Sequence, residues 1–193
     1  MASRVKNRQQ LFLQPLRKRT TFNLRQMMNR DSIQMAKRQI FYSFHYDKDV
    51  WRVQQIRNMH VIEGNEPISK NAWEDVEAGG DAKIQKWIDD NLRYRSCLIV
   101  LIGSDTAGRK WIDYEIKKAW KDGKGVFGIY IHNLGDSIGK TDTKGKNPFL
   151  GTNFTKNGNS VTLATYDPPS TNVINTLKAN IESWIEIAIK QAS

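Results

Sequence analysis

The sequence has little cysteine and no long apolar run. Its single cysteine, Cys97, rules out an internal disulfide and is compatible with a reducing compartment. Because Cys97 lies within an apolar stretch, we expect it to act as a small buried hydrophobic residue. That stretch, 97–102, has six residues, whereas about 20 are needed to cross a bilayer. The sequence therefore predicts a cytoplasmic protein that does not enter the membrane.

Acidic residues are scarce near the N-terminus. Residues 1–34 contain eight Lys or Arg and one acid, Asp31. The rest of the chain contains 22 Lys or Arg and 19 acids. Most of the net charge of +10 therefore belongs to this segment. We interpret it as a basic, flexible extension that precedes a domain over residues 35–193. Its composition would equally suit a transit peptide or contact with an anionic surface, and we expect nucleic-acid binding only through this segment.

The rest of the chain predicts one α/β domain. Two kinds of stretch follow one another along the chain. Some are short and either apolar or alternating between apolar and polar residues, and in the others apolar residues recur every three or four positions. The predicted strands are 39–44, a weak one at 68–73, 97–102, 126–131 and 160–166. The predicted helices are 50–59, 81–92, 109–120 and 173–188, the first capped by Asp47 or Asp49 and the last by Thr171 or Asn172. This alternation favours a parallel sheet with helices on both faces.

The most informative stretch begins with the strand at 97–102, whose β-branched content suits burial on both faces of a sheet. A turn follows, and then a helix in which Trp111 and Glu115 share one face. In an open α/β sheet, the carboxyl edge of a central strand is where ligands bind. Taken alone, however, Trp111 could be a core residue and Glu115 a solvated one. A polar segment at 132–159 is long enough to predict a functional or a mobile loop.

The spacing of Trp111 and Glu115 resembles the Trp-x-x-x-Glu signature of TIR domains. Three further stretches resemble the TIR subunit of the bacterial Thoeris antiphage defence system. They are Phe-Tyr-Ser-Phe-His-Tyr at 41–46, Ala-Trp-Glu-Asp at 72–75 and Lys-Gly-Lys-Asn-Pro-Phe at 144–149. The last is the most specific, because it lies in a loop where packing restricts composition little. Together the four stretches identify the chain as a member of the TIR family.

This resemblance implies a flavodoxin-like fold of about five parallel strands in the order 2-1-3-4-5. It also implies an enzyme that cleaves the nicotinamide–ribose bond of NAD+ and produces a cyclic ADP-ribose-type signal that activates a partner effector protein. NAD+ would be the substrate, and we expect no cofactor. Self-association through the surfaces that TIR domains use is a further implication. The sequence does not decide between cyclisation and hydrolysis.

The resemblance makes Glu115 the catalytic residue and places Phe44, His45 and Asp47 at the border of its pocket. Trp111 or Phe44 could stack on a ring of the substrate. The remaining predicted substrate-binding residues would hold ribose hydroxyls, and they are Ser43, Ser104 and Asp105. We predict no metal site, because the three histidines, His45, His60 and His132, have no ligand-like spacing with Cys97 or with paired acids.

A carboxylate suits this chemistry. Breaking the glycosidic bond to a cationic nicotinamide builds positive charge on the ribose, and a carboxylate can stabilise that charge or briefly trap it. Two other classes of function stay open from the residues alone. One is a TIR adaptor that only assembles with other TIR domains. The other is a receiver domain of a phosphorelay, for which Asp47 and Asp105 fit partly, although no Lys follows the strand that ends at Tyr166.

Overall fold

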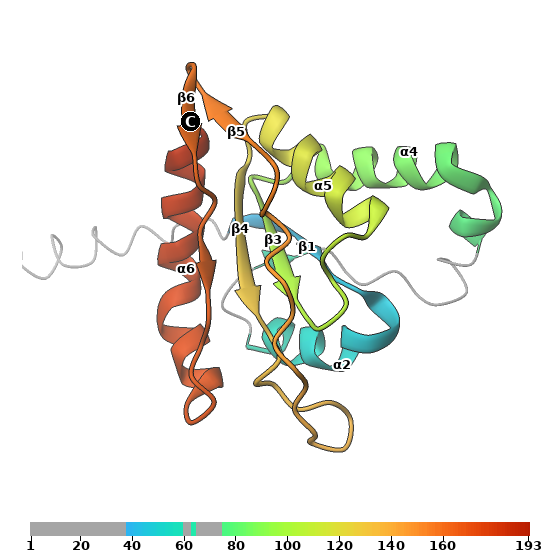
Figure 1. The fold of residues 1–193 in the computed structure, drawn as a ribbon. Coiled ribbons are helices and arrows are strands. Elements are labelled where there is room, and N and C mark those ends of the chain that lie inside the picture. The colour runs from blue at the N-terminus through green and yellow to red at the C-terminus, as the bar shows by residue number, and fades with distance from the viewer. Residues whose placement is uncertain (1–37, 60–62, 65–74) are drawn as a thin grey trace, which may run out of the picture. The chain divides into compact units, whose positions relative to one another are not determined.

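A parallel sheet forms the centre of the domain in a computed structural model of the chain, which describes residues 38–59, 63–64 and 75–193 (Figure 1). The sheet has five strands in the order β2-β1-β3-β4-β7, and all neighbouring pairs are parallel. The predicted order 2-1-3-4-5 is therefore confirmed. The strands are β1 (Gln39–Ser43), β2 (Glu63–Gly64), β3 (Cys97–Ile102), β4 (Gly125–Tyr130) and β7 (Thr165–Tyr166).

β3 is the innermost strand, and all six of its residues are buried. It pairs with β1 along one edge and with β4 along the other, so that Ile99 lies opposite both Tyr42 and Phe127. Cys97 is fully buried, as predicted, and burial raises the pKa of its thiol. Because both faces of β3 are buried, its sequence is apolar throughout and does not alternate between apolar and polar residues.

Helices cover both faces of the sheet (Figure 1). They are α2 (Tyr46–Arg57), α4 (Gly80–Leu92), α5 (Lys110–Lys121) and α6 (Val173–Ala192). Successive strand residues point to opposite faces, so Tyr42 packs with apolar residues of α2 and α6, whereas Phe41 packs with those of α4 and α5. The two layers account for the apolar stripes on these helices. α5 begins near the carboxyl end of β3 and packs on the sheet face that carries Phe41.

The two predicted edge strands have different outcomes. On the side away from β3, β1 pairs with β2, at Glu63–Gly64, whereas the predicted strand 68–73 lies outside the described residues. The predicted strand 160–166 is wrong in its extent, because its first part belongs to a separate antiparallel hairpin of β5 (Phe154–Lys156) and β6 (Asn159–Val161). Asn157 and Gly158 form its turn with positive φ angles of 50° and 79°, a conformation that this residue pair favours. Only β7 reaches the edge of β4.

The predicted start of the first helix also needs correction. Its N-cap is His45, which makes no side-chain capping bond, and neither Asp47 nor Asp49 caps the helix. Both acids lie in the first turn instead, where a negative charge interacts favourably with the helix dipole. Asn172 occupies the N-cap of α6, also without a side-chain capping bond.

Several predictions fall outside the described residues. The basic extension 1–34 is among them, and so are His60 and residues 72–74 of the Ala-Trp-Glu-Asp stretch. The boundary between the extension and the domain 35–193 stays a prediction. Among the helices in the described part of the chain, none has both the length and the apolar character needed to cross a membrane.

Candidate active site

A cavity of about 390 Å³ lies where β1 ends and α5 begins. In a parallel sheet these two points meet at the carboxyl edge, where open α/β folds bind ligands. Its lining residues are Phe44, His45, Tyr46, Asp47, Glu77, Arg109, Lys110, Trp111, Ile112 and Glu115. Five of the eight predicted site residues are in this lining. The segment after β1 and the first two turns of α5 thus form one site.

Glu115 is the buried acid of this cavity. It lies on the inward face of α5 with Ile112, Ile116 and Ala119, and only 8% of its surface is exposed. Ser43, the last residue of β1, donates a hydrogen bond from Oγ to Glu115 Oε2. Burial raises the pKa of Glu115 from its ordinary value of 4.5 to about 8, although the bond from Ser43 acts in the opposite direction. The raised pKa favours the protonated, neutral form of this carboxyl group.

Aromatic rings supply much of the remaining wall. Trp111 precedes Glu115 by about one helical turn and lines the same cavity. Its ring packs edge-on against Tyr114 at 5.9 Å, and the Lys110 ammonium lies 4.6 Å from its centroid. Phe44 and Tyr46, from the segment that follows β1, lie 6.2 Å apart at an interplanar angle of 31°. The cavity therefore offers flat apolar surfaces next to one acid.

His45 is a neutral part of the wall. Burial lowers its pKa, and the positive charge of Arg109 lowers it further. Its Nδ1 atom is buried and makes no hydrogen bond to any described residue. Asp47, whose carboxylate lies 4.0 Å from His45 Nε2, is 83% exposed at the rim.

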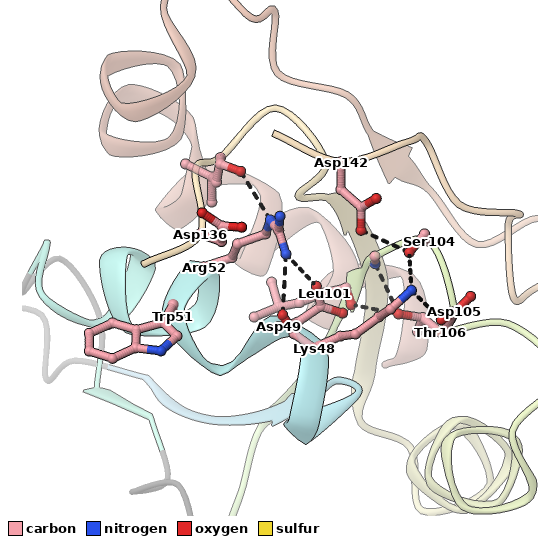
Figure 2. A network of polar contacts seen from close by, with 12 residues as sticks. Lys48, Asp49, Trp51, Arg52, Leu101, Ser104, Asp105, Thr106, Asp136 and Asp142 are labelled. Atoms are coloured by element: carbon pink, nitrogen blue, oxygen red, sulfur yellow. Dashed lines mark hydrogen bonds and ion pairs between the residues drawn. The ribbon is translucent and has the colours of Figure 1, made fainter. Parts of the chain in front are cut away.

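Ser104 and Asp105 are placed elsewhere. They follow β3 but do not line the cavity. Asp105 forms an ion pair with Lys48 at 2.5 Å, and Ser104 Oγ donates to Asp142 at 2.8 Å while accepting from Lys48 at 3.3 Å (Figure 2). These contacts join α2, the turn after β3 and the loop after β4. In this structure the two residues engage the protein rather than the cavity, so their predicted contact with ribose has no geometric support.

A buried ion pair lies beside this cluster (Figure 2). Asp49 and Arg52 are 1% and 4% exposed, and their charged atoms are 3.3 Å apart. Arg52 also donates to the backbone carbonyls of Leu134 at 3.0 Å and Lys140 at 3.2 Å. The Asp49 carboxylate packs directly on Gly103, where any Cβ would collide with it. This pair fastens the loop after β4 to α2. Sequence reasoning missed it because the loop carbonyls that Arg52 contacts are 82 and 88 positions away in the chain.

The stretch 144–149 fastens the same loop from its other end. Gly145 packs against the backbone of Gly103 so closely that a side chain would collide with it. Lys144 forms an ion pair with Asp167 at 2.7 Å. None of these residues lines the cavity. The stretch therefore has a structural role at the sheet edge, and its glycine is required by a close approach between backbones.

Five residues of the lining were not predicted as site residues: Tyr46, Glu77, Arg109, Lys110 and Ile112. Arg109 is the N-cap of α5 and Lys110 is its first residue. Both immediately precede Trp111, so their proximity to a site built on Trp111 and Glu115 was visible in the sequence. Glu77 comes from the helical turn before α4, and no local pattern connects it with α5.

The comparisons with known proteins agree with this architecture. Residues 41–136 match the family model described as Thoeris protein ThsB, TIR-like domain. Over 136 residues the chain is 36% identical to a protein of Bacillus cereus (strain MSX-D12) that is named a proposed cyclic ADP-D-ribose synthase, ThsB1. That alignment covers 67% of this chain and 70% of the relative.

A parallel sheet in the order 2-1-3-4-5, with a buried Glu one turn after a Trp at its carboxyl edge, defines a domain of the TIR type. More specifically, the chain belongs to the Thoeris ThsB family of TIR-like proteins. The predicted resemblance is confirmed. The receiver-domain interpretation is set aside, because the family match, from residue 41 to residue 136, includes the end of β1 and the Trp111 helix on which the TIR interpretation depends.

Proposed function

We propose that the protein is an enzyme of antiphage defence that cleaves the nicotinamide–ribose bond of NAD+. The observation that carries the proposal is Glu115, a nearly buried carboxyl group that lines the cavity between β1 and α5. The name of the Bacillus cereus relative supports the same substrate chemistry, because a cyclic ADP-D-ribose is made from NAD+ by releasing nicotinamide. The expected product is a cyclic ADP-ribose-type nucleotide that activates a partner effector protein.

The bond that breaks joins the anomeric carbon of the ribose to the pyridinium nitrogen. Its electron pair leaves with nicotinamide, which becomes neutral, and positive charge develops on the ribose. An ionised Glu115 at about 4 Å would attract that charge by roughly 4 kcal/mol at an effective dielectric of about 20. If this attraction is present only in the transition state, it corresponds to about a thousandfold in rate.

The protonation state of Glu115 is coupled to substrate binding. In the empty cavity its raised pKa favours the neutral acid. The cationic pyridinium of NAD+ beside it would favour the carboxylate, and the hydroxyl of Ser43 already donates to that carboxylate. Ser43 thereby orients the acid instead of binding ribose, while Trp111 and Phe44 offer ring surfaces to the base. The cation is then captured either by water or, for a cyclic product, by a nucleophilic atom of the adenosine part.

The direct test compares wild type with the variant Glu115→Gln, which keeps the size of the side chain and removes its ionisation. We expect the variant to fold and to lose nicotinamide release by about a thousandfold or more, measured by mass spectrometry of NAD-derived nucleotides in cells with and without phage challenge. Glu182→Gln makes the same change at an exposed position of α6 and should leave turnover unchanged. A folded Glu115→Gln protein with normal turnover would remove Glu115 from the mechanism, and a wild type silent with and without phage would favour an adaptor.

A further inference from the structure

The lining of the cavity contains a cation that the chemistry at Glu115 does not use. Arg109 is exposed at the N-cap of α5. Its Nε donates to the backbone carbonyl of Asp105 at 2.8 Å, which orients the guanidinium. No acid among the described residues forms an ion pair with it. Lys110, by contrast, is paired with Asp81 and lies over the Trp111 ring.

The charge of Arg109 acts inside the cavity and not only at the surface. After burial, it is the largest cause of the lowered pKa of His45, a residue of the same lining. The rim also carries the carboxylates of Asp47 and Glu77, which would repel an anion and can instead accept hydrogen bonds from hydroxyl groups. Among the cations of this lining, Arg109 is therefore the one available to bind an anionic group of a ligand.

The spacing along α5 suits a nucleotide. Arg109 and Glu115 are six positions apart, which corresponds to about 9 Å along a helix axis. This is comparable with the distance from the anomeric carbon of a nucleotide, across the sugar, to its phosphates. A guanidinium is also the side chain that best matches phosphate oxygens, because its planar fork can donate two parallel hydrogen bonds.

We propose that Arg109 binds the diphosphate of the substrate, so that the cavity selects a dinucleotide over a nucleoside with the same sugar and base. The proposal rests on the proposed function for the position of the ribose at Glu115. It makes Arg109 a residue that determines substrate class, whereas Glu115 acts on the bond that breaks. Removing Arg109 should weaken binding of diphosphate ligands without changing the chemistry of the ribose.

The test measures equilibrium binding of two ligands by calorimetry, ADP-ribose, which carries the diphosphate, and nicotinamide riboside, which does not. In Arg109→Gln the dissociation constant for ADP-ribose should increase about tenfold or more, and that for nicotinamide riboside should not change. Arg109→Lys, which keeps the charge but loses the fork, should lie between wild type and Arg109→Gln. Lys117→Gln removes a charge from an exposed position of the same helix that does not line the cavity, and both ligands should bind it as they bind wild type.

The outcomes separate this inference from the proposed function. If wild type releases nicotinamide from NAD+ but Arg109→Gln binds ADP-ribose normally, the diphosphate assignment is wrong and the enzymatic proposal stands. If wild type binds ADP-ribose through Arg109 but never releases nicotinamide, the binding assignment stands and the enzymatic proposal fails. Absence of ADP-ribose binding to the folded wild type, or equal loss of both ligands in Arg109→Gln, would overturn the inference.

Discussion

Burial, and not a neighbouring acid, raises the pKa of Glu115. The side chain faces the apolar residues that anchor α5 on the sheet, and its one hydrogen bond within the described structure comes from Ser43. A carboxyl group in such a place is costly to ionise in an empty site and strongly attracted to a cation that enters it. The same burial that holds the acid in place therefore makes it responsive to a positively charged substrate.

This burial predicts a pH dependence of stability. The pKa of Glu115 is 4.5 ordinarily and about 8 in the folded protein, so between these values the folded state holds a proton that the unfolded state has lost. The contribution of this group to the free energy of unfolding is therefore largest below about pH 4.5. It decreases as the pH rises and is fully lost above about pH 8. Glu115→Gln cannot ionise. We expect it to melt near wild type at pH 5 and above wild type at pH 9, by roughly 2–4 °C for each kcal/mol of ionisation cost removed.

Thermal unfolding followed by circular dichroism at the two pH values measures this difference. Glu182→Gln, an exposed change of the same kind, should melt with wild type at both. Parallel melting curves for wild type and Glu115→Gln across this range would show that the acid is not buried as described.

At the scale of elements, the carboxyl edge of the sheet is divided between two polar groups. Glu115 and Ser43 belong to the cavity between β1 and α5, whereas Asp49 and Arg52 of α2 fasten the loop after β4. The second group gives the long polar segment a definite place against the sheet. It also keeps Ser104 away from the cavity, since that hydroxyl is bonded to Asp142.

The buried ion pair predicts that removing Arg52 alone destabilises the protein more than removing the charges of both partners. Arg52→Met leaves Asp49 buried without its partner, and it also removes the donors to the loop carbonyls, so we expect a loss of about 3–5 kcal/mol in the free energy of unfolding. Adding Asp49→Asn removes the unpaired charge and should restore part of this loss. Chemical denaturation of the two single variants and the double variant measures the coupling. Strict additivity of the two single effects would contradict a direct interaction between these side chains.

At the scale of the whole molecule, the independence of the core from the basic extension 1–34 stays a prediction. The two apolar clusters of the core contain residues from Ile40 onwards among the described residues, and the family match begins at residue 41. Self-association through TIR surfaces and a cytoplasmic location stay predictions. So does contact of the extension with nucleic acid, which would show as a steep salt dependence that disappears with the segment.

Deletion of residues 1–34 should therefore leave the fold intact. We expect the melting temperature to change by less than about 2 °C, which corresponds to less than about 1 kcal/mol in a domain of this size. Differential scanning calorimetry of the full chain and the shortened chain provides the comparison. A clearly lower melting temperature in the shortened chain would move the domain boundary toward the N-terminus.

The sequence by itself determined the α/β class and the position of Glu115 relative to Trp111. These follow from local periodicity and from motif spacing, which a single helix or strand preserves whatever surrounds it. The family resemblance added the strand order. The extent of the last predicted strand was wrong, because pairing partners, and not local pattern, decide where a short edge strand begins.

Only the tertiary structure decided which polar residues share a site. Ser43 and Glu115 are 72 positions apart in the chain and meet because β1 ends and α5 begins at the same edge of the sheet. Ser104 and Asp105 are much closer to Glu115 in sequence, yet they contact α2 and the loop after β4. The physical reason is that hydrogen bonding and burial depend on distances in space, and a raised pKa such as that of Glu115 exists only when the surrounding apolar layers have packed.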